Sequence, residues 1–205
     1  ASFRTLDAGV QIIWNVAEGE RVAADTVLCE LHGKTRALVS AERSALNFLQ
    51  TLCGTATLVR RYVDAVAGIN VRIMDTRKTL PGLRIAQKYA VKIGGGMNQR
   101  IGLFDGILIK ENHIAAAGGV QAALDAAQRQ ADTGVSIQIE VESIDELQQA
   151  LDAGAKLILL DNFSIEQMRE AVSLTNQRAK LEASGGITLD NVRAIADTGV
   201  ARISI

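Results

Sequence analysis

The sequence lacks three features that would each assign it to a broad class of proteins. It has only two cysteines, Cys29 and Cys53, without a CxxC pair or a metal-type spacing, which argues against a disulfide framework and a zinc site. It lacks an excess of one charge: 22 basic and 23 acidic residues leave a formal net charge of −1, which argues against a nucleic-acid or membrane-surface partner. It also lacks an apolar run near the ~20 residues that a membrane helix needs, and no signal-peptide pattern opens it.

The remaining composition is typical of an ordinary soluble globular protein. Hydrophobic residues make up 48% of a chain of 205 residues, which is long enough for one large domain, or for one domain and part of another. We therefore interpret Cys29 and Cys53 as reduced thiols that pack in a cytoplasmic protein.

The first forty residues form a short β-rich module, or part of one. Residues 10–16 and 22–31 carry strand-like apolar and β-branched runs, separated by the turn-forming sequence Glu18-Gly19-Glu20. Residues 35–39 predict a further strand.

A long helix is predicted from Ser40, whose hydroxyl can cap the first free amides, to a stop before Gly68 and Asn70. Its apolar residues recur at steps of three and four: Leu46, Leu49, Cys53, Ala56, Val59, Val63 and Val66. Arg43 extends this stripe by one turn toward the helix start. A snorkelling side chain is one explanation of that position, and a functional arginine is the other.

Beyond residue 70, strand-like and helical patterns alternate, which predicts an α/β fold with a parallel sheet and favours a barrel. The strands are expected at residues 71–74, 106–109, 136–139, 157–160, 180–183 and 201–205. The helices are expected at residues 83–93, 120–131, 144–153, 165–174 and 189–196. Six strands predict an incomplete barrel or a fold with fewer strands than the usual eight.

Polar or ionisable groups close almost every predicted strand. They are Asp75-Thr76-Arg77-Lys78, Lys110-Glu111-Asn112-His113, Glu140, Asp161-Asn162, Ser184-Gly185-Gly186 and Ser204. A single such residue is usually a solvated loop charge. Their repetition predicts one shared site, because the carboxyl ends of the strands of a βα barrel meet on one face.

The chemical types in that site indicate an anionic ligand. Arg77, Lys78, Arg100 and Lys110 are cations suited to carboxylate or phosphate oxygens. Ser184-Gly185-Gly186, followed by a predicted helix start at Ile187-Thr188, is suited to a phosphate. Glu140 and Asp161 can hold Mg²⁺ or ribose hydroxyls. Gly94-Gly95-Gly96 is interpreted as a flexible connection.

With these residues in place, the sequence resembles the quinolinate phosphoribosyltransferases. The matching stretches are ERSALNFLQTLCGTAT (42–57), DTRKTLPGLR (75–84), KYAVKIGGGMNQRIGLFDGILIKENH (88–113), IEVES (139–143), LILLDNF (157–163) and LEASGGIT (181–188). The resemblance implies part of an α/β sandwich domain over residues 1–41 and an incomplete α/β barrel over residues 42–205. Family members are longer, and the strand-like ending at Ile205 also predicts a continuation.

The resemblance further implies an activity and a role for each candidate residue. The family transfers phosphoribosyl from phosphoribosyl pyrophosphate to quinolinate with decarboxylation, using Mg²⁺, and gives nicotinate mononucleotide for NAD biosynthesis. Quinolinate would be held by Arg77, Arg100 and Lys110, with Thr76 and Gln99 at the same site, and Lys78 would lie at the phosphates. The catalytic group would comprise Lys110, Glu140 and Asp161, of which Glu140 and Asp161 would serve the ribose hydroxyls and Mg²⁺. Ser184, Gly185 and Gly186 would bind the 5′-phosphate, and Ser204 would also bind the substrate.

Two features of the resemblance concern single residues. Arg43 would lie at the interface of a homodimer, or a higher homo-oligomer, and reach the neighbouring subunit's active site. Gln99 stands where the family usually has His, and a neutral amide cannot supply the charge that a protonated His can.

Three alternatives remain open from the sequence alone. A nicotinate phosphoribosyltransferase would need fewer carboxylate-binding cations. A Schiff-base aldolase could use Lys110 as its nucleophile. A carrier-like β module over residues 10–40 would use Lys34 as its modified residue, although the flanking residues of such modules are absent.

Overall fold

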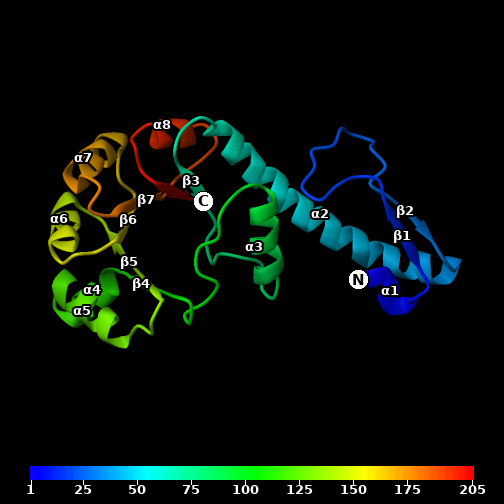
Figure 1. Cartoon of the computed structure of the whole chain (residues 1–205), viewed down its shortest axis with the longest axis horizontal. Helices are drawn as coiled ribbons and strands as arrows, with labels where there is room; N and C mark the ends of the chain where they lie inside the picture. Colours follow the sequence, from blue (N-terminus) through cyan, green and yellow to red (C-terminus); the bar gives the residue numbers. More distant parts are fainter.

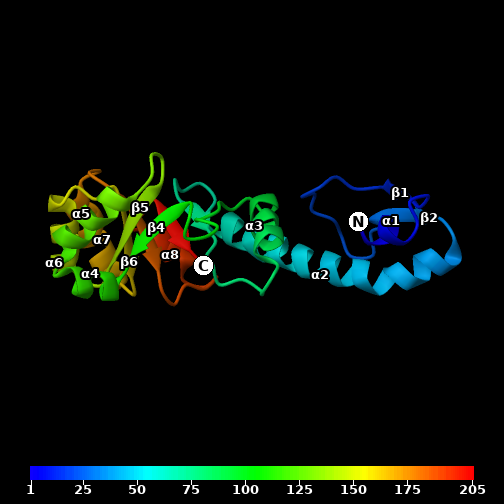
Figure 2. The ribbon, with the colours of Figure 1, turned by 90° about the horizontal axis from the view of Figure 1, so that it is seen from below.

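One long helix, α2 (Thr35–Ala65), connects two parts of the chain that lie at its opposite ends (Figures 1 and 2). The structure is a computed structural model that describes residues 1–205. A small N-terminal module packs beside the start of α2, and a larger sheet-and-helix body follows its end. No helix in the structure is both long enough and apolar enough to cross a membrane.

The N-terminal module contains α1 (Ser2–Leu6), β1 (Gln11–Trp14) and β2 (Cys29–His32), and the two strands pair antiparallel. The second strand is shorter than the predicted run of residues 22–31, because only its end pairs with β1. The strand predicted at residues 35–39 is wrong. These residues form the first turn of α2, so Ser40 lies inside the helix and does not cap it.

The apolar stripe of α2 is only partly covered. Val66, just past the helix end, is buried, whereas Cys53 is exposed, so the prediction that Cys53 packs in a core is wrong for this chain by itself. The second half of α2 packs against α3 (Arg84–Ile93) and the glycines after it. A Cβ on Gly94 would lie 2.6 Å from the Ala56 carbonyl oxygen, and one on Gly96 would lie 2.9 Å from Val59 Cγ1. These glycines therefore permit close packing, and the predicted flexible connection is wrong.

The larger body is built on a parallel sheet of six strands. They are β3 (Arg72–Met74), β4 (Gly106–Ile109), β5 (Ser136–Val141), β6 (Leu157–Asp161), β7 (Lys180–Ser184) and β8 (Arg202–Ser204). The strand order is β3-β8-β7-β6-β5-β4, so β3 and β4 are unjoined edges of a curved sheet. The predicted α/β class and the incomplete barrel are confirmed.

Five helices cover the outer face of the sheet (Figure 1). They are α4 (Glu111–Ala117), α5 (Val120–Gln130), α6 (Ile144–Asp152), α7 (Ile165–Thr175) and α8 (Val192–Ala196). Ile139, Ile158 and Ile203 are fully buried in the core between these helices and the sheet. Because successive strand residues point to opposite faces, Gln138, Glu140, Glu182 and Arg202 point to the inner face.

Candidate active site

Most of the predicted site residues lie at one rim of the barrel, at the carboxyl ends of its strands. Thr76, Arg77 and Lys78 follow β3, Lys110 follows β4, and Glu140 lies near the end of β5. Asp161, Ser184 and Ser204 are the last residues of β6, β7 and β8. All six strands are parallel, so their carboxyl ends open on the same side, which is where active sites lie in βα barrels.

Lys110 and two carboxylates form a charged cluster at this rim. Lys110 Nζ donates to Glu140 Oε1 at 2.9 Å, and Glu140 is almost fully buried. The hydrogen bond with Glu140, together with the negative charges of Glu140, Glu111 and Asp161, raises the pKa of Lys110 against the opposing effect of burial. Lys110 is thus held as an ammonium ion, which disfavours it as a Schiff-base nucleophile, because that role needs a neutral amine.

Arg77 and Arg100 form a second positive centre. Burial and the nearby positive charge of Arg77 lower the pKa of Arg100, and Asp105 opposes this effect. The Arg100 guanidinium donates to the Gly106 carbonyl at 2.9 Å, and neither Arg77, Arg100 nor the exposed Lys78 belongs to any ion pair of the chain. Neighbouring cations without carboxylate partners are suited to an anionic ligand.

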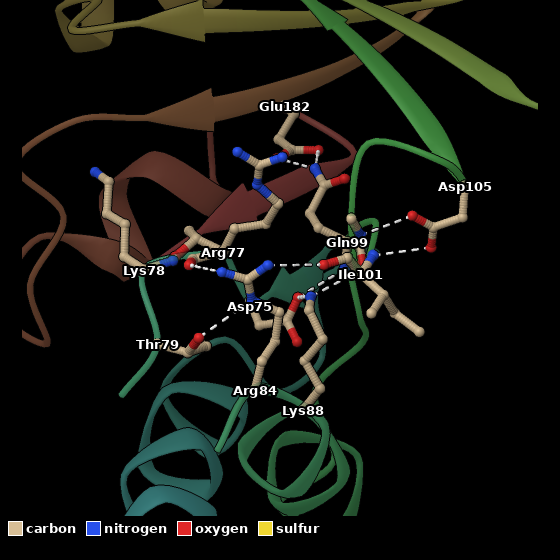
Figure 3. Close-up of polar contacts among 12 residues, drawn as sticks. Asp75, Arg77, Lys78, Thr79, Arg84, Lys88, Gln99, Ile101, Asp105 and Glu182 are labelled. Carbon is tan, nitrogen blue, oxygen red and sulfur yellow. Dashed lines mark hydrogen bonds and ion pairs between the residues drawn. The ribbon is translucent and has the colours of Figure 1, made fainter. Parts of the chain in front are cut away.

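A buried ion pair holds the segment that carries Gln99 and Arg100. Lys88 Nζ lies 2.6 Å from Asp75 Oδ1 and also donates to the Gln99 carbonyl at 2.9 Å (Figure 3). The Gln99 backbone N–H donates to the same Asp75 oxygen at 2.7 Å. Burial raises the pKa of Asp75, while Lys88 and the Gln99 N–H oppose the shift. Sequence reasoning missed Lys88, and its signal was a charged residue within the apolar pattern of α3.

Arg84 connects the two loops that carry the cations. Its guanidinium donates to the Arg77 carbonyl at 3.2 Å, the Ile101 carbonyl at 3.1 Å and Thr79 Oγ1 at 3.2 Å (Figure 3). Asp105 closes the second loop by accepting from the backbone N–H groups of Ile101 and Gly102, and these hydrogen bonds lower its pKa. Arg84 therefore fixes the spacing between the loops of Arg77 and Arg100, a role that sequence reasoning did not find.

Gln99 points toward the inner face of the barrel. Its Nε2 lies 2.5 and 2.6 Å from the two carboxylate oxygens of Glu182 and 3.3 Å from Gln138 Oε1. Both amide protons are thus engaged by the protein. Glu182, with an exposed fraction of 1%, was not among the predicted site residues, although a charged residue inside an apolar strand run is the expected signal of a barrel-interior position.

The Ser184-Gly185-Gly186 turn offers free backbone donors. Gly185 and Gly186 have φ values of 96° and 60°, and a Cβ on Gly185 would overlap the side chain of Asn162, so glycine is required there. The N–H groups of Gly185, Gly186 and Ile187 donate to no backbone or side-chain acceptor of the chain. The predicted helix start at Ile187-Thr188 is wrong, because α8 begins at Val192, so any phosphate affinity here comes from the turn and not from a helix end. Ser204 Oγ, which is buried, donates to the Ala183 carbonyl at 3.4 Å.

Arg43 is separated from the other candidates within one chain. It lies 22 residues before the end of α2, which corresponds to about 33 Å along the helix axis. α2 begins beside the N-terminal module and ends beside β3 (Figure 1). Arg43 therefore cannot contact the strand ends of its own chain.

No group of three or more metal-type side chains is present. Glu140 and Asp161 both raise the pKa of Lys110, so their carboxylates lie near one another. Two carboxylates fit Mg²⁺ when phosphate oxygens and waters complete its coordination, which is how Mg²⁺ is usually bound.

Comparisons with known proteins give consistent results over the whole chain. Residues 2–53 match the family model "Quinolinate phosphoribosyl transferase, N-terminal domain", and residues 55–205 match the corresponding C-terminal domain. The boundary between them and the predicted one at residues 41–42 both fall inside the uninterrupted helix α2.

Individual relatives agree with the family models. The probable nicotinate-nucleotide pyrophosphorylase (carboxylating) of Bacillus subtilis is 45% identical over 203 residues, which are 99% of this chain and 70% of the relative. The corresponding Synechocystis protein is 40% identical over 205 residues, which cover 98% of this chain and 70% of the relative. The nicotinate-nucleotide pyrophosphorylase structure from Francisella tularensis superposes with a TM-score of 0.96 at 45% identity, over 100% of this chain and 72% of that one. The chain belongs to the quinolinate phosphoribosyltransferase family.

Proposed function

We propose that the chain catalyses the transfer of phosphoribosyl from phosphoribosyl pyrophosphate to quinolinate with loss of CO₂, giving nicotinate mononucleotide for NAD biosynthesis. The observation that carries this proposal is the pair of guanidinium groups, Arg77 and Arg100: the charge of Arg77 lowers the pKa of Arg100, and neither group belongs to an ion pair of the chain. With Lys110 they supply three cations for an anionic ligand. Quinolinate carries two adjacent carboxylates, and guanidinium groups are suited to such oxygens.

The ribose end of the substrate is assigned to the carboxylates Glu140 and Asp161. As the bond between ribose and pyrophosphate breaks, positive charge develops on the ribose, and fixed carboxylates nearby stabilise it. Lys78 at the exposed rim and the free N–H groups of Gly185 and Gly186 are suited to phosphate oxygens. Thr76, Ser184 and Ser204 border these groups. A Mg²⁺ ion held by Glu140, Asp161 and the pyrophosphate would neutralise the leaving group.

The order of bond changes follows from the substrate chemistry. The quinolinate ring nitrogen forms a bond to ribose C1 while the C1–pyrophosphate bond breaks. The ring nitrogen then carries a positive charge, which stabilises the electron pair left on the adjacent ring carbon when its carboxylate departs as CO₂. A proton from solvent completes the ring carbon. No general base is needed, which is in accord with a site dominated by cations.

The same proposal includes a homodimer with shared active sites in the cytoplasm. Arg43 lies too far from its own strand ends to act there, and a second copy could place it over the rim of its partner. Val39, Phe48 and Leu58 leave large apolar surfaces exposed on α2, with exposed fractions of 66%, 52% and 47%, and such surfaces favour association. The two free cysteines fit a reducing compartment.

The deciding experiment is product analysis. The protein is incubated with quinolinate, phosphoribosyl pyrophosphate and Mg²⁺, and nicotinate mononucleotide is measured by chromatography. Parallel reactions omit phosphoribosyl pyrophosphate or replace quinolinate with nicotinate. Product that forms from quinolinate and not from nicotinate, and only with phosphoribosyl pyrophosphate, supports the proposal. Faster product formation from nicotinate would identify a nicotinate phosphoribosyltransferase instead.

A further inference from the structure

Glu182 is a buried carboxylate held mainly by neutral groups. It lies on β7 with an exposed fraction of 1% and accepts from Gln99 Nε2 at 2.5 and 2.6 Å and from Gln138 Nε2 at 3.1 Å. The charged group nearest to it is Arg202 on β8, whose Nη1 lies 3.9 Å from Glu182 Oε2. A buried carboxylate with one cation at that distance is only partly compensated.

The surroundings of Glu182 favour its neutral form. Burial raises the pKa of Glu182, and the hydrogen bonds from Gln138 and Gln99, the charge of Arg202 and a contact with Ser204 oppose the shift. On the β6 side the register neighbour is the apolar Leu159. Beyond Gln99 lie the buried ions Lys88 and Asp75, which contact the Gln99 backbone. Arg202 is thus the one side chain that forms an ion pair with Glu182, and the Arg77 side chain also extends toward this part of the site (Figure 3).

The orientation of Gln99 depends on Glu182. With a carboxylate next to it, the Gln99 amide directs its N–H groups toward Glu182 (Figure 3) and also toward Gln138 Oε1. The Gln99 oxygen accepts no hydrogen bond from the chain. This oxygen is not fully buried, because the chain has only one fully buried side-chain oxygen or nitrogen without a partner, and that atom is Thr175 Oγ1. An open carbonyl oxygen is an acceptor, and it would repel a carboxylate of the substrate.

A proton on Glu182 would reverse this arrangement. A neutral carboxyl group can donate its O–H to the Gln99 oxygen, and rotation of the amide then turns the Gln99 N–H groups away from Glu182. The rotated amide presents a donor in place of an acceptor. The same proton removes a negative charge from beneath the cations that would hold the substrate.

We propose that Glu182 is a positioning residue for the anionic substrate: quinolinate binding places a solvent proton on Glu182, and the neutral carboxyl turns Gln99 so that its amide N–H groups face the bound carboxylate. This inference rests on the proposed function, since it requires that quinolinate binds at the rim. Gln99 carries no charge, so its role in this proposal depends on the protonation state of Glu182.

Calorimetry of quinolinate binding tests the proposal. Titrations in buffers of different ionisation enthalpy give the number of protons taken up, and they are carried out on the unaltered protein, on Glu182→Gln and on Glu142→Gln, a control at an exposed glutamate one residue beyond β5. On binding quinolinate, the unaltered protein and the control should each take up more protons than Glu182→Gln, and the difference should approach about one proton. As pH rises from the Glu182 pKa of the free protein to its higher pKa in the complex, quinolinate affinity should weaken by up to about tenfold per pH unit in the first two proteins and by less in Glu182→Gln.

The outcomes separate this inference from the proposed function. Equal proton uptake by Glu182→Gln and the unaltered protein would overturn the role of Glu182 while leaving quinolinate binding intact. Absence of quinolinate binding in every protein would overturn both. If Glu182→Gln does not fold, infrared difference spectra of the unaltered protein decide the matter: quinolinate should produce the C=O band of a buried protonated carboxyl group, and its absence refutes the proposal.

Discussion

Lys88 Nζ lies 2.6 Å from Asp75 Oδ1, and both side chains are almost fully buried, with exposed fractions of 3% and 8%. The pair joins α3 to the end of β3 and, through the Gln99 backbone, to the segment that carries Arg100. It contacts none of the predicted substrate groups other than Gln99. Its position assigns it to the support of the active site and not to its chemistry.

Removing one member of this pair should strongly destabilise the fold. Lys88→Met leaves the Asp75 carboxylate buried without its cation, which costs about 3–5 kcal/mol. Arg193→Met is the matched control, because Arg193 and Asp197 form an exposed ion pair at 3.6 Å, and its loss should cost at most about 1 kcal/mol. Urea unfolding measures both, and equal losses would show that burial of the Lys88 pair has no energetic consequence.

His113 should support Lys110 by accepting one hydrogen bond. Its Nδ1 accepts from the Lys110 backbone N–H at 3.0 Å at the start of α4, where the Lys110 side chain provides no cap. Glutamine is a usual acceptor at this position, so His113→Gln should retain activity, whereas His113→Ala should lower kcat/KM about fivefold, corresponding to ~1 kcal/mol. His32→Ala, at the other and exposed histidine, should change nothing. Equal defects in His113→Gln and His113→Ala would exclude the acceptor role.

The carboxylate-binding role of Arg100 predicts a loss that depends on the ligand. Arg100→Met should weaken quinolinate binding by about 2–5 kcal/mol, because a desolvated charged partner is removed. Nicotinate, with one carboxylate fewer, should lose much less. Arg129→Met on the outer helix α5 serves as the control. Titration calorimetry with both ligands makes the comparison, and the same loss for quinolinate and nicotinate contradicts the assignment.

The shared-site hypothesis predicts that two inactive proteins complement each other. Subunits carrying Arg43→Ala and subunits carrying Lys110→Ala are each expected to be inactive alone. In a random mixture about half of the dimers are hybrids with one intact site each, so activity should recover to about one quarter of normal. Subunit exchange is verified with differently tagged chains, and exchange without recovery refutes shared sites.

The sequence predicted the barrel better than the N-terminal module. Strand residues 106–109 and the helix starts at Val120, Ile144 and Ile165 are confirmed, because buried strands and amphipathic helices leave strong apolar patterns. Residues 35–39 were predicted wrongly, because a five-residue run does not distinguish a strand from the first turn of a long helix.

The candidate residues were found because they follow strands, whereas their supports are scattered through the sequence. Lys110 and Asp161 follow recognisable strands. Lys88, Arg84 and Glu182 act through contacts with residues 5 to 83 positions away, as in the hydrogen bonds Arg84–Thr79 and Gln99–Glu182. No local pattern specifies such contacts, since only the three-dimensional packing brings the partners together.

The fate of the two quinolinate carboxylates tests the central claim most directly. The protein is supplied with quinolinate labelled in either the 2-carboxylate or the 3-carboxylate, and labelled CO₂ is measured with and without phosphoribosyl pyrophosphate. The account predicts label release from the 2-carboxylate alone, which adjoins the ring nitrogen, and only when phosphoribosyl pyrophosphate is present. Release without phosphoribosyl pyrophosphate, release from the 3-carboxylate, or no release at all would contradict it.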